Sequence, residues 1–150
     1  MAVSSGSISS FSSDPSQSIN RLMLIQSLSD FKKAIKKEKV DIKRVNDDNT
    51  SLLHWYCSSG RQDIVDYLLQ VGVPITTNKT NHQIPLHCTV DCNDKMEDTK
   101  RENIILSLVA AGVEVDQQDV NGWTALKLAC RFGLYECVYY LLSNRADAEK

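Results

Sequence analysis

Apolar residues recur along the chain in blocks with helical spacing, and three of these blocks begin with the same kind of short motif. The motif reads Ser51-Leu52-Leu53-His54, then Ile84-Pro85-Leu86-His87, then Thr124-Ala125-Leu126-Lys127, at separations of 33 and 40 residues. Each copy predicts a short helix, which is followed by a second apolar run of helical period. Such a period is typical of stacked repeats. The pattern therefore predicts an all-α solenoid of stacked helix-turn-helix units.

The second helix of each unit is predicted from apolar residues spaced by one helical turn. These residues are Ile64, Val65, Leu68 and Leu69 in the first copy, Ile104, Ile105, Leu108 and Val109 in the second, and Val138, Leu141 and Leu142 in the third. Gly72 and Gly112 follow the first two runs, in the place of a left-handed C-terminal cap. In the third copy Arg145 takes this place, so we expect its last turn to be less firmly closed.

The segment before the first copy predicts a capping unit. Residues 19–42 have helical apolar spacing in two pieces, and we expect Ser29-Asp30 to begin the second. Around Phe31 the intervening positions are mostly lysine, from Lys32 to Lys39. A helix with one apolar stripe and a lysine-rich outer face suits the first unit of a solenoid, because one of its sides has no neighbour.

These patterns divide the chain into a tail and four units. We expect a disordered serine-rich tail at 1–18, a capping repeat at 19–45, and repeats at 46–78, 79–118 and 119–147. The tail is interpreted as a solvated leader or as a phosphorylated segment. The second repeat has about seven extra residues between its helices, within 91–100, and we expect them to form an exposed loop or a helix extension.

Charge and cysteine usage narrow the classes of function. The formal net charge is −2 and the pI about 5.9, which does not favour direct nucleic-acid binding. No apolar run reaches the roughly 18 residues that cross a bilayer, and Met1 to Ser18 does not resemble a secretory signal. Five cysteines without such a signal favour reduced thiols inside the cell, in the cytoplasm or nucleus. The lysine run could contact nucleic acid or an acidic partner, or be a solvated face.

One group of residues has the chemistry of a metal or nucleophile site. His87, Cys88 and Cys92 are close in sequence, with His82 before them and Cys57 in the preceding copy. The repeat register makes His87 and Cys88 framework residues and leaves only Cys92 exposed, which favours a structural role. Because no phosphate loop or other catalytic motif is present, we expect no catalytic residue, metal or cofactor.

The repeats resemble the ankyrin family, whose pattern is about D-x-x-G-x-T-P-L-H-x-A-A-x-x-G followed by L-L and G-A. The third copy matches it from Asp119 to Gly133, and the first from Asn46 to Gly60 with Asn49 at the turn glycine. The second copy has His82 at that glycine. The resemblance covers about residues 20–147 and implies β-turn or hairpin tips on the helical solenoid.

The resemblance also implies a module that binds a protein partner, without catalysis, through the repeat tips and the concave face. Mapped onto this sequence, the implied partner-binding residues at the tips are Asp47, Asp48, Thr50, Thr80, Asn81, Gln83, Val120, Asn121 and Trp123. Those implied on the concave face are Ser58, Asp91, Cys92, Arg131 and Phe132. Trp123, Arg131 and Phe132 are the leading candidates, because aromatic residues and arginine dominate binding energy at interfaces. The alternative for Trp123 is packing against the adjacent hairpin, and for Phe132 a contact with a further repeat.

Departures from the pattern add further expectations. Tyr56 replaces a small alanine and should push two repeats apart or point outward, and Lys127 replaces the usual histidine. No polar helix follows the third copy, so we expect Leu128 and Leu141 to be poorly covered. The chain would then be the front of a longer protein, or would cover this face by self-association or with a partner. Two other functions stay open, namely a regulatory segment of a larger and perhaps enzymatic protein, and a redox- or metal-responsive protein that uses Cys92.

Overall fold

The fold was determined as a computed structural model that describes residues 21–92 and 96–144. Within these residues the chain is all-helical, with the helices α3 (Leu28–Glu38), α4 (Leu52–Ser58), α5 (Gln62–Gln70), α6 (Pro85–Val90), α7 (Asp98–Ala110), α8 (Ala125–Arg131) and α9 (Tyr135–Ser143). None of them is long and apolar enough to cross a membrane. The serine-rich segment 1–18 and Arg145 lie outside the described residues.

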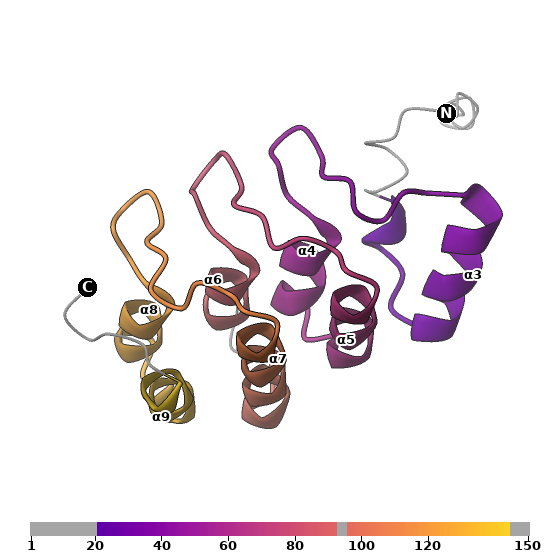
Figure 1. The fold of residues 1–150 in the computed structure, drawn as a ribbon. Helices are drawn as coiled ribbons and strands as arrows, with labels where there is room; N and C mark the ends of the chain where they lie inside the picture. Colours follow the sequence, from indigo (N-terminus) through magenta and orange to yellow (C-terminus); the bar gives the residue numbers. More distant parts are fainter. Residues whose placement is uncertain (1–20, 93–95, 145–150) are drawn as a thin grey trace, which may run out of the picture.

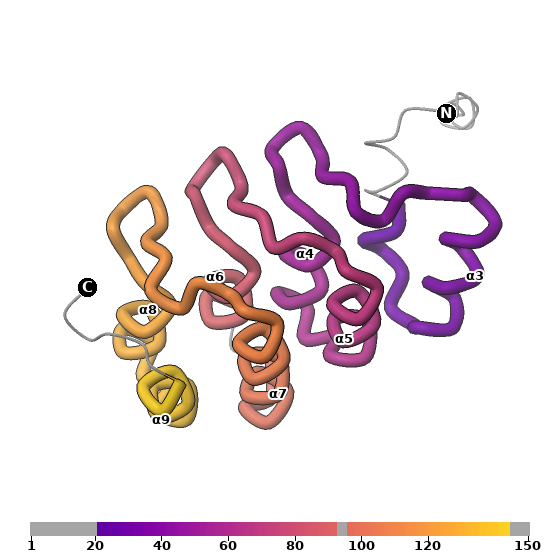
Figure 2. Tube along the Cα trace, in the orientation of Figure 1, coloured from indigo at the N-terminus to yellow at the C-terminus, as the bar shows by residue number. Residues whose placement is uncertain are grey.

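The helices form two parallel rows. In Figure 1 the helices α4, α6 and α8 lie side by side in one row, α5, α7 and α9 form the second, and α3 stands at one end. Three loops that precede α4, α6 and α8 project from the same edge, and the tube in Figure 2 shows their similar course. The two helices of each repeat contact each other, and each also contacts its equivalent in a neighbouring repeat, while α3 contacts α5. The predicted solenoid of helix pairs is confirmed.

Local sequence signals explain where the helices begin. Ser51 and Thr124 accept hydrogen bonds from the backbone N–H groups three residues later, as N-cap side chains do. Pro85 occupies the first turn of α6, where a missing N–H has no cost. The tip residues Asn49, His82 and Gly122 all have positive φ, at 61°, 56° and 80°. The sequence register had placed these three residues at the turn position, and their shared conformation confirms it.

The N-terminal unit differs from the expectation in its boundaries. Ser27, and not Ser29-Asp30, is the N-cap of α3, with its hydroxyl accepting a hydrogen bond from the Asp30 N–H. Before it, Arg21 and Leu22 are helical and Met23 and Leu24 form the turn that follows, which agrees with the first of the two expected helical pieces. Leu22 and Met23 are buried in the core.

Tyr56 does not point outward, contrary to one of the two expectations for it. Its side chain is fully buried, and its hydroxyl donates to the backbone carbonyls of Leu22 and Ile25. Phe31 packs edge-on against it, with ring centroids 5.4 Å apart. Tyr56 therefore joins the N-terminal segment to the first repeat.

The inserted segment is partly a helix extension. Asp98, Thr99 and Lys100 belong to the first turn of α7, which has 13 residues against 9 in α5 and in α9. Arg101 is only 2% exposed, and it donates to the Thr89 carbonyl, the Asp98 carboxylate and the Cys92 sulfur. Met96 packs onto the core beside Gly60. The extra residues are therefore tied to the solenoid at several points.

The C-terminal end is also better covered than expected. Leu128 and Leu141 are 6% and 0% exposed, so the expectation that they are poorly covered was wrong. They are buried because α8 and α9 pack against each other and against α6 and α7. The exposed apolar side chains at this end are instead Phe132, Tyr135, Tyr139 and Leu142.

Candidate functional site

Each repeat tip is closed by one side-chain oxygen. The Asp119 carboxylate accepts hydrogen bonds from the N–H groups of Asn121 and Trp123, both at 2.9 Å. Asn46 does the same for Asp48 and Thr50 in the first tip. In the second tip the equivalent residue is Asn78, which bonds the N–H groups of Asn81 and Gln83. This tip has one more residue than the other two, and all three present their side chains from a fixed backbone.

Several predicted partner-binding residues bond neighbouring tips instead. One Asp48 carboxylate oxygen accepts from the Thr80 N–H at 2.9 Å and from the Thr80 hydroxyl at 2.5 Å. The hydrogen bond from the Thr80 hydroxyl is the main reason why the pKa of Asp48 is lowered. Between the next two tips, the Val120 N–H donates to the Asn81 carbonyl at 2.9 Å. Asp48, Thr80 and Asn81 therefore contribute to the spacing of the repeats.

His54 and His87 connect successive repeats. The Ser51 N–H donates to His54 Nδ1 at 3.1 Å, so Nε2 bears the proton and donates to the Gln83 carbonyl at 2.9 Å. His87 is placed in the same way between the Ile84 N–H and the Trp123 carbonyl. Burial lowers the pKa of both imidazoles. Across 21–92 and 96–144 no group of three or more His, Cys, Asp or Glu side chains is arranged to hold a metal ion.

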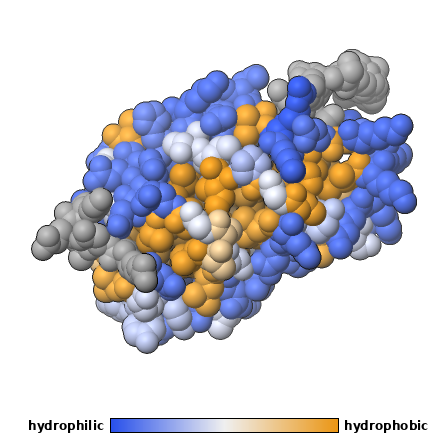
Figure 3. All heavy atoms as spheres, in the orientation of Figure 1, coloured by the Kyte–Doolittle hydropathy of each residue, from blue (hydrophilic) through white to orange (hydrophobic). Residues whose placement is uncertain are grey.

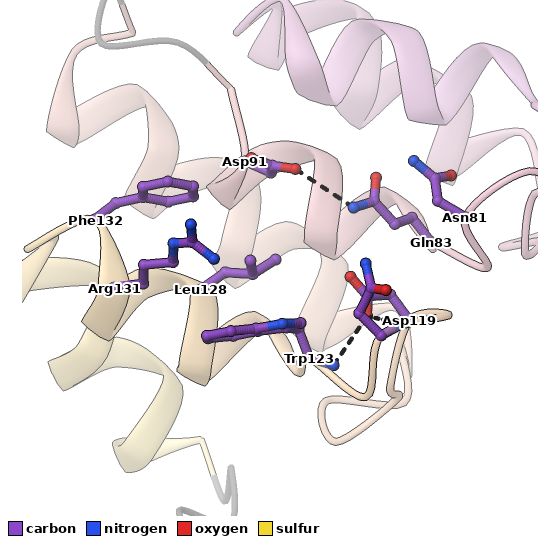
Figure 4. Close-up of a pocket in the computed structure, with 9 residues that line it drawn as sticks. Asn81, Gln83, Asp91, Asp119, Trp123, Leu128, Arg131 and Phe132 are labelled. Carbon is purple, nitrogen blue, oxygen red and sulfur yellow. Dashed lines mark hydrogen bonds between the residues drawn. The ribbon is translucent and has the colours of Figure 1, made fainter.

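A cleft of about 330 Å³ lies between the second and third repeats. We call it the Trp123 cleft; its lining residues are Asn81, Gln83, Asp91, Asp119, Asn121, Trp123, Leu128, Arg131 and Phe132. Two tips supply one wall, and the end of α6 together with α8 supplies the rest, as Figure 4 shows. Seven of these residues were among the implied partner-binding set, and the fold brings them around one hollow.

Aromatic and cationic groups form one side of the cleft. The Arg131 guanidinium carbon lies 5.3 Å from the centre of the Trp123 ring, a cation–π arrangement that fixes the exposed arginine over the half-buried indole. The ion pairs formed among the described residues do not include Arg131. Phe132, the C-cap of α8, is 46% exposed beside it. This side offers a charge and apolar surface to a ligand.

Hydrogen-bond acceptors form the opposite side. The Asp91 carboxylate is exposed and accepts from the Gln83 amide at a long 3.4 Å. Gln83, expected at an exposed tip, is only 8% exposed. Its side-chain amide donates to Asp91, and its backbone carbonyl accepts a hydrogen bond from His54. The buried Asn81 Oδ1 has no hydrogen-bond partner among the described residues. Unsatisfied acceptors of this kind favour a ligand that brings donors.

The remaining predicted residues lie outside the cleft. Ser58 is exposed at the end of α4, and Asp47 at the first tip, while Thr50 is half-buried there. Cys92, expected to be exposed, is half-buried, because its sulfur accepts from Arg101 at 3.3 Å. The exposed thiol is that of Cys130.

Two residues at the same position of the repeat, Leu128 and Trp55, were not among the predicted partner-binding residues. Leu128 lies in the cleft, and Trp55 occupies the equivalent position in α4, where it is 42% exposed. The repeat register contained the signal for both, because they are the residues directly after Lys127 and His54 in the recurring motif. The pattern leaves this position variable, so it does not by itself mark either residue as a partner contact.

Comparisons with known proteins agree with this architecture. A family model described as ankyrin repeats (3 copies) matches residues 22–119 and 98–150. The chain is 42% identical over 48 residues to the 26S proteasome non-ATPase regulatory subunit 10 of Homo sapiens, and equally to that of Rattus norvegicus. Each of these matches covers 32% of this chain and 21% of the relative.

A third similar protein carries the name of an enzyme. The chain is 28% identical over 144 residues to an L-asparaginase of Dirofilaria immitis, a match that covers 79% of this chain and 24% of the asparaginase. The chain thus spans about a quarter or less of the length of these curated relatives. The family model, in contrast, matches most of the chain, and its ranges include the helix pairs α4–α5, α6–α7 and α8–α9. The chain therefore belongs to the ankyrin-repeat family.

Proposed function

We propose that this domain is a non-catalytic module that binds a protein partner through the Trp123 cleft. The observation that supports the proposal is the stack of Arg131 on Trp123 beside the exposed ring of Phe132. These three side chains were the leading candidates from the sequence. Tryptophan and arginine are enriched among the residues whose truncation costs an interface most.

The cleft also has the layout of an interface centre. The exposed ring of Phe132 is flanked by the Arg131 cation on one side and the Asp91 carboxylate on the other. Because α8 and the closed third tip support them, these side chains are held in place before a partner arrives, which lowers the entropic cost of binding. The five cysteines of the chain are free thiols, which supports a setting inside the cell.

The test is affinity capture of a partner from native lysate, followed by a dissociation constant for the purified pair. We expect Arg131→Ala and Phe132→Ala each to weaken binding about tenfold or more, as residues at an interface centre do. Tyr139→Ala is the matched control, because Tyr139 is 65% exposed on α9 and does not line the cleft. A partner bound equally well by all three variants would show that the cleft is not the binding site.

A second candidate function is a regulatory segment within a larger enzyme. The similarity to the L-asparaginase covers most of this chain but only 24% of that protein, which supports this alternative. Sequencing of the full transcript tests it. A stop codon directly after Lys150 would reject it, and an open frame that continues into a catalytic domain would support it.

A further inference from the structure

The charge of this protein is unevenly distributed along the solenoid. Residues 28–44, which contain α3 and the loop after it, have seven basic and three acidic residues, a formal charge of +4. The whole chain has −2, so all other residues together have −6. Figure 3 shows hydrophilic side chains along the end that α3 occupies, whereas apolar side chains gather across the middle of the same view. The N-terminal end is therefore a basic face on an otherwise acidic domain.

The basic face is rigidly attached. Phe31 is fully buried and packs edge-on against Tyr56 and Tyr67, at centroid distances of 5.4 Å and 6.3 Å. Lys32 lies over the Tyr67 ring at 4.7 Å. The side of α3 opposite Phe31 consequently presents Lys33, Lys36 and Lys37, which are all exposed.

Among the described residues, the lysines of this face form few ion pairs. Only Lys33 takes part in an ion pair among the described residues, with Asp30 at 3.9 Å, and both side chains are largely exposed. Lys33 and Lys37 are four residues apart, and like charges at this spacing destabilise a helix by a few tenths of a kcal/mol. A cap that only needed to be soluble could mix both signs of charge. The retained repulsion favours a partner that supplies the missing negative charge.

We propose that the outer face of α3 is a second docking surface, which binds an acidic segment of a protein. With 11 residues α3 is about 16 Å long, which matches a short peptide segment. The exposed carboxylates of Glu38 and Asp41 lie at and just after the C-terminal end of α3, where they would repel a phosphate backbone that extends beyond the helix. The surface lies at the end of the solenoid opposite to α8, so it is separate from the Trp123 cleft.

The test measures binding of a fluorescent peptide of twelve residues, mostly glutamate, to the full chain at low and at physiological salt. We expect Lys33→Gln/Lys36→Gln/Lys37→Gln to weaken binding about tenfold and to reduce its salt dependence. Glutamine suits a helix nearly as well as lysine, so α3 should remain folded. The matched control, Lys79→Gln/Lys100→Gln/Lys127→Gln, changes the net charge equally and should weaken binding less than twofold.

Other outcomes would overturn the proposal. An equal loss of peptide affinity in the two triple variants would show an effect of net charge alone. If the peptide does not bind at low salt, the outer face of α3 is not a docking surface for acidic segments. Tighter binding of a 20-base-pair duplex or of phosphatidylserine vesicles than of the peptide would assign the face to another class of partner. Arg131→Ala should leave peptide binding unchanged, so this result and the test of the Trp123 cleft can fail separately.

Discussion

At the scale of single residues, Tyr56 shows how one substitution in a repeat can acquire a structural role. The pattern has a small residue here, and the larger ring would clash with an ordinary preceding repeat. In this chain the ring packs against Phe31 of α3, and its hydroxyl donates to the backbone carbonyls of Leu22 and Ile25. Burial raises the pKa of Tyr56, so the hydroxyl stays protonated as a donor.

We predict that Tyr56→Phe lowers the free energy of unfolding by about 1–3 kcal/mol. The ring would still fill its site, but the carbonyls of Leu22 and Ile25 would lose their common donor in a buried place. Urea denaturation followed by circular dichroism measures the change. Tyr139→Phe, at an exposed position, should alter the stability by less than about 0.5 kcal/mol. Equal stability of the two variants would contradict a structural role for the Tyr56 hydroxyl.

At the scale of elements, the longer α7 depends on Arg101. The guanidinium joins α6 to the first turn of α7 through the Thr89 carbonyl, the Cys92 sulfur and the Asp98 carboxylate. A buried arginine with several partners at once is pre-organised by its planar fork of donors. The extra turn is therefore fixed to the end of α6 in the second repeat.

We predict that Arg101→Ala costs about 2–4 kcal/mol of stability, since it removes three hydrogen bonds and leaves a cavity. Arg101→Lys should recover only part of this loss, because an ammonium cannot reproduce the fork. Thermal or urea unfolding measures both, with Lys100→Ala as the exposed neighbouring control. Retention of full stability in Arg101→Ala would mean that the inserted segment is not anchored through this residue.

At the scale of the whole molecule, His54 and His87 connect the three repeats into one stack. Each donates from Nε2 to a carbonyl of the following tip, and Lys127 stands at the same position in the third repeat. The two imidazoles are neutral and buried. Protonation would place a positive charge in a buried site and would remove Nδ1 as a hydrogen-bond acceptor. The coupling between repeats should therefore depend on pH.

We predict that the free energy of unfolding falls as the pH decreases from 7.5 to 5.5. Burial lowers the pKa of both histidines below the value near 6.5 of the unfolded chain. The stabilising contribution is complete above that value, and it is lost as the unfolded chain gains protons that the folded one does not bind. Urea titrations at several pH values measure the slope. His54→Gln and His87→Gln should each reduce it, and an unchanged slope in both variants would contradict the assignment.

The repeat period, the helix pairs and the conformations of the turns follow from the amino-acid sequence alone. These features depend on local signals, such as the motif at Ser51, the apolar spacing of α5 and the residues Asn49 and Gly122 at the tips. Such signals act over a few residues, so they can be read without knowing which segments meet. The leading candidates Trp123, Arg131 and Phe132 also came from position in the repeat, and they line one cleft.

The pairing of side chains between repeats, in contrast, depends on tertiary packing. Asp48 and Thr80 were expected to meet a partner, yet they bond each other across 32 residues of sequence. Tyr56 and Arg101 find buried partners, and Leu128 and Leu141 are covered, for the same reason. These contacts join groups on different elements, and their distances depend on how closely the repeats stack. A residue's place in the repeat determines its conformation, whereas the packing of neighbouring repeats determines whether its side chain is free to bind.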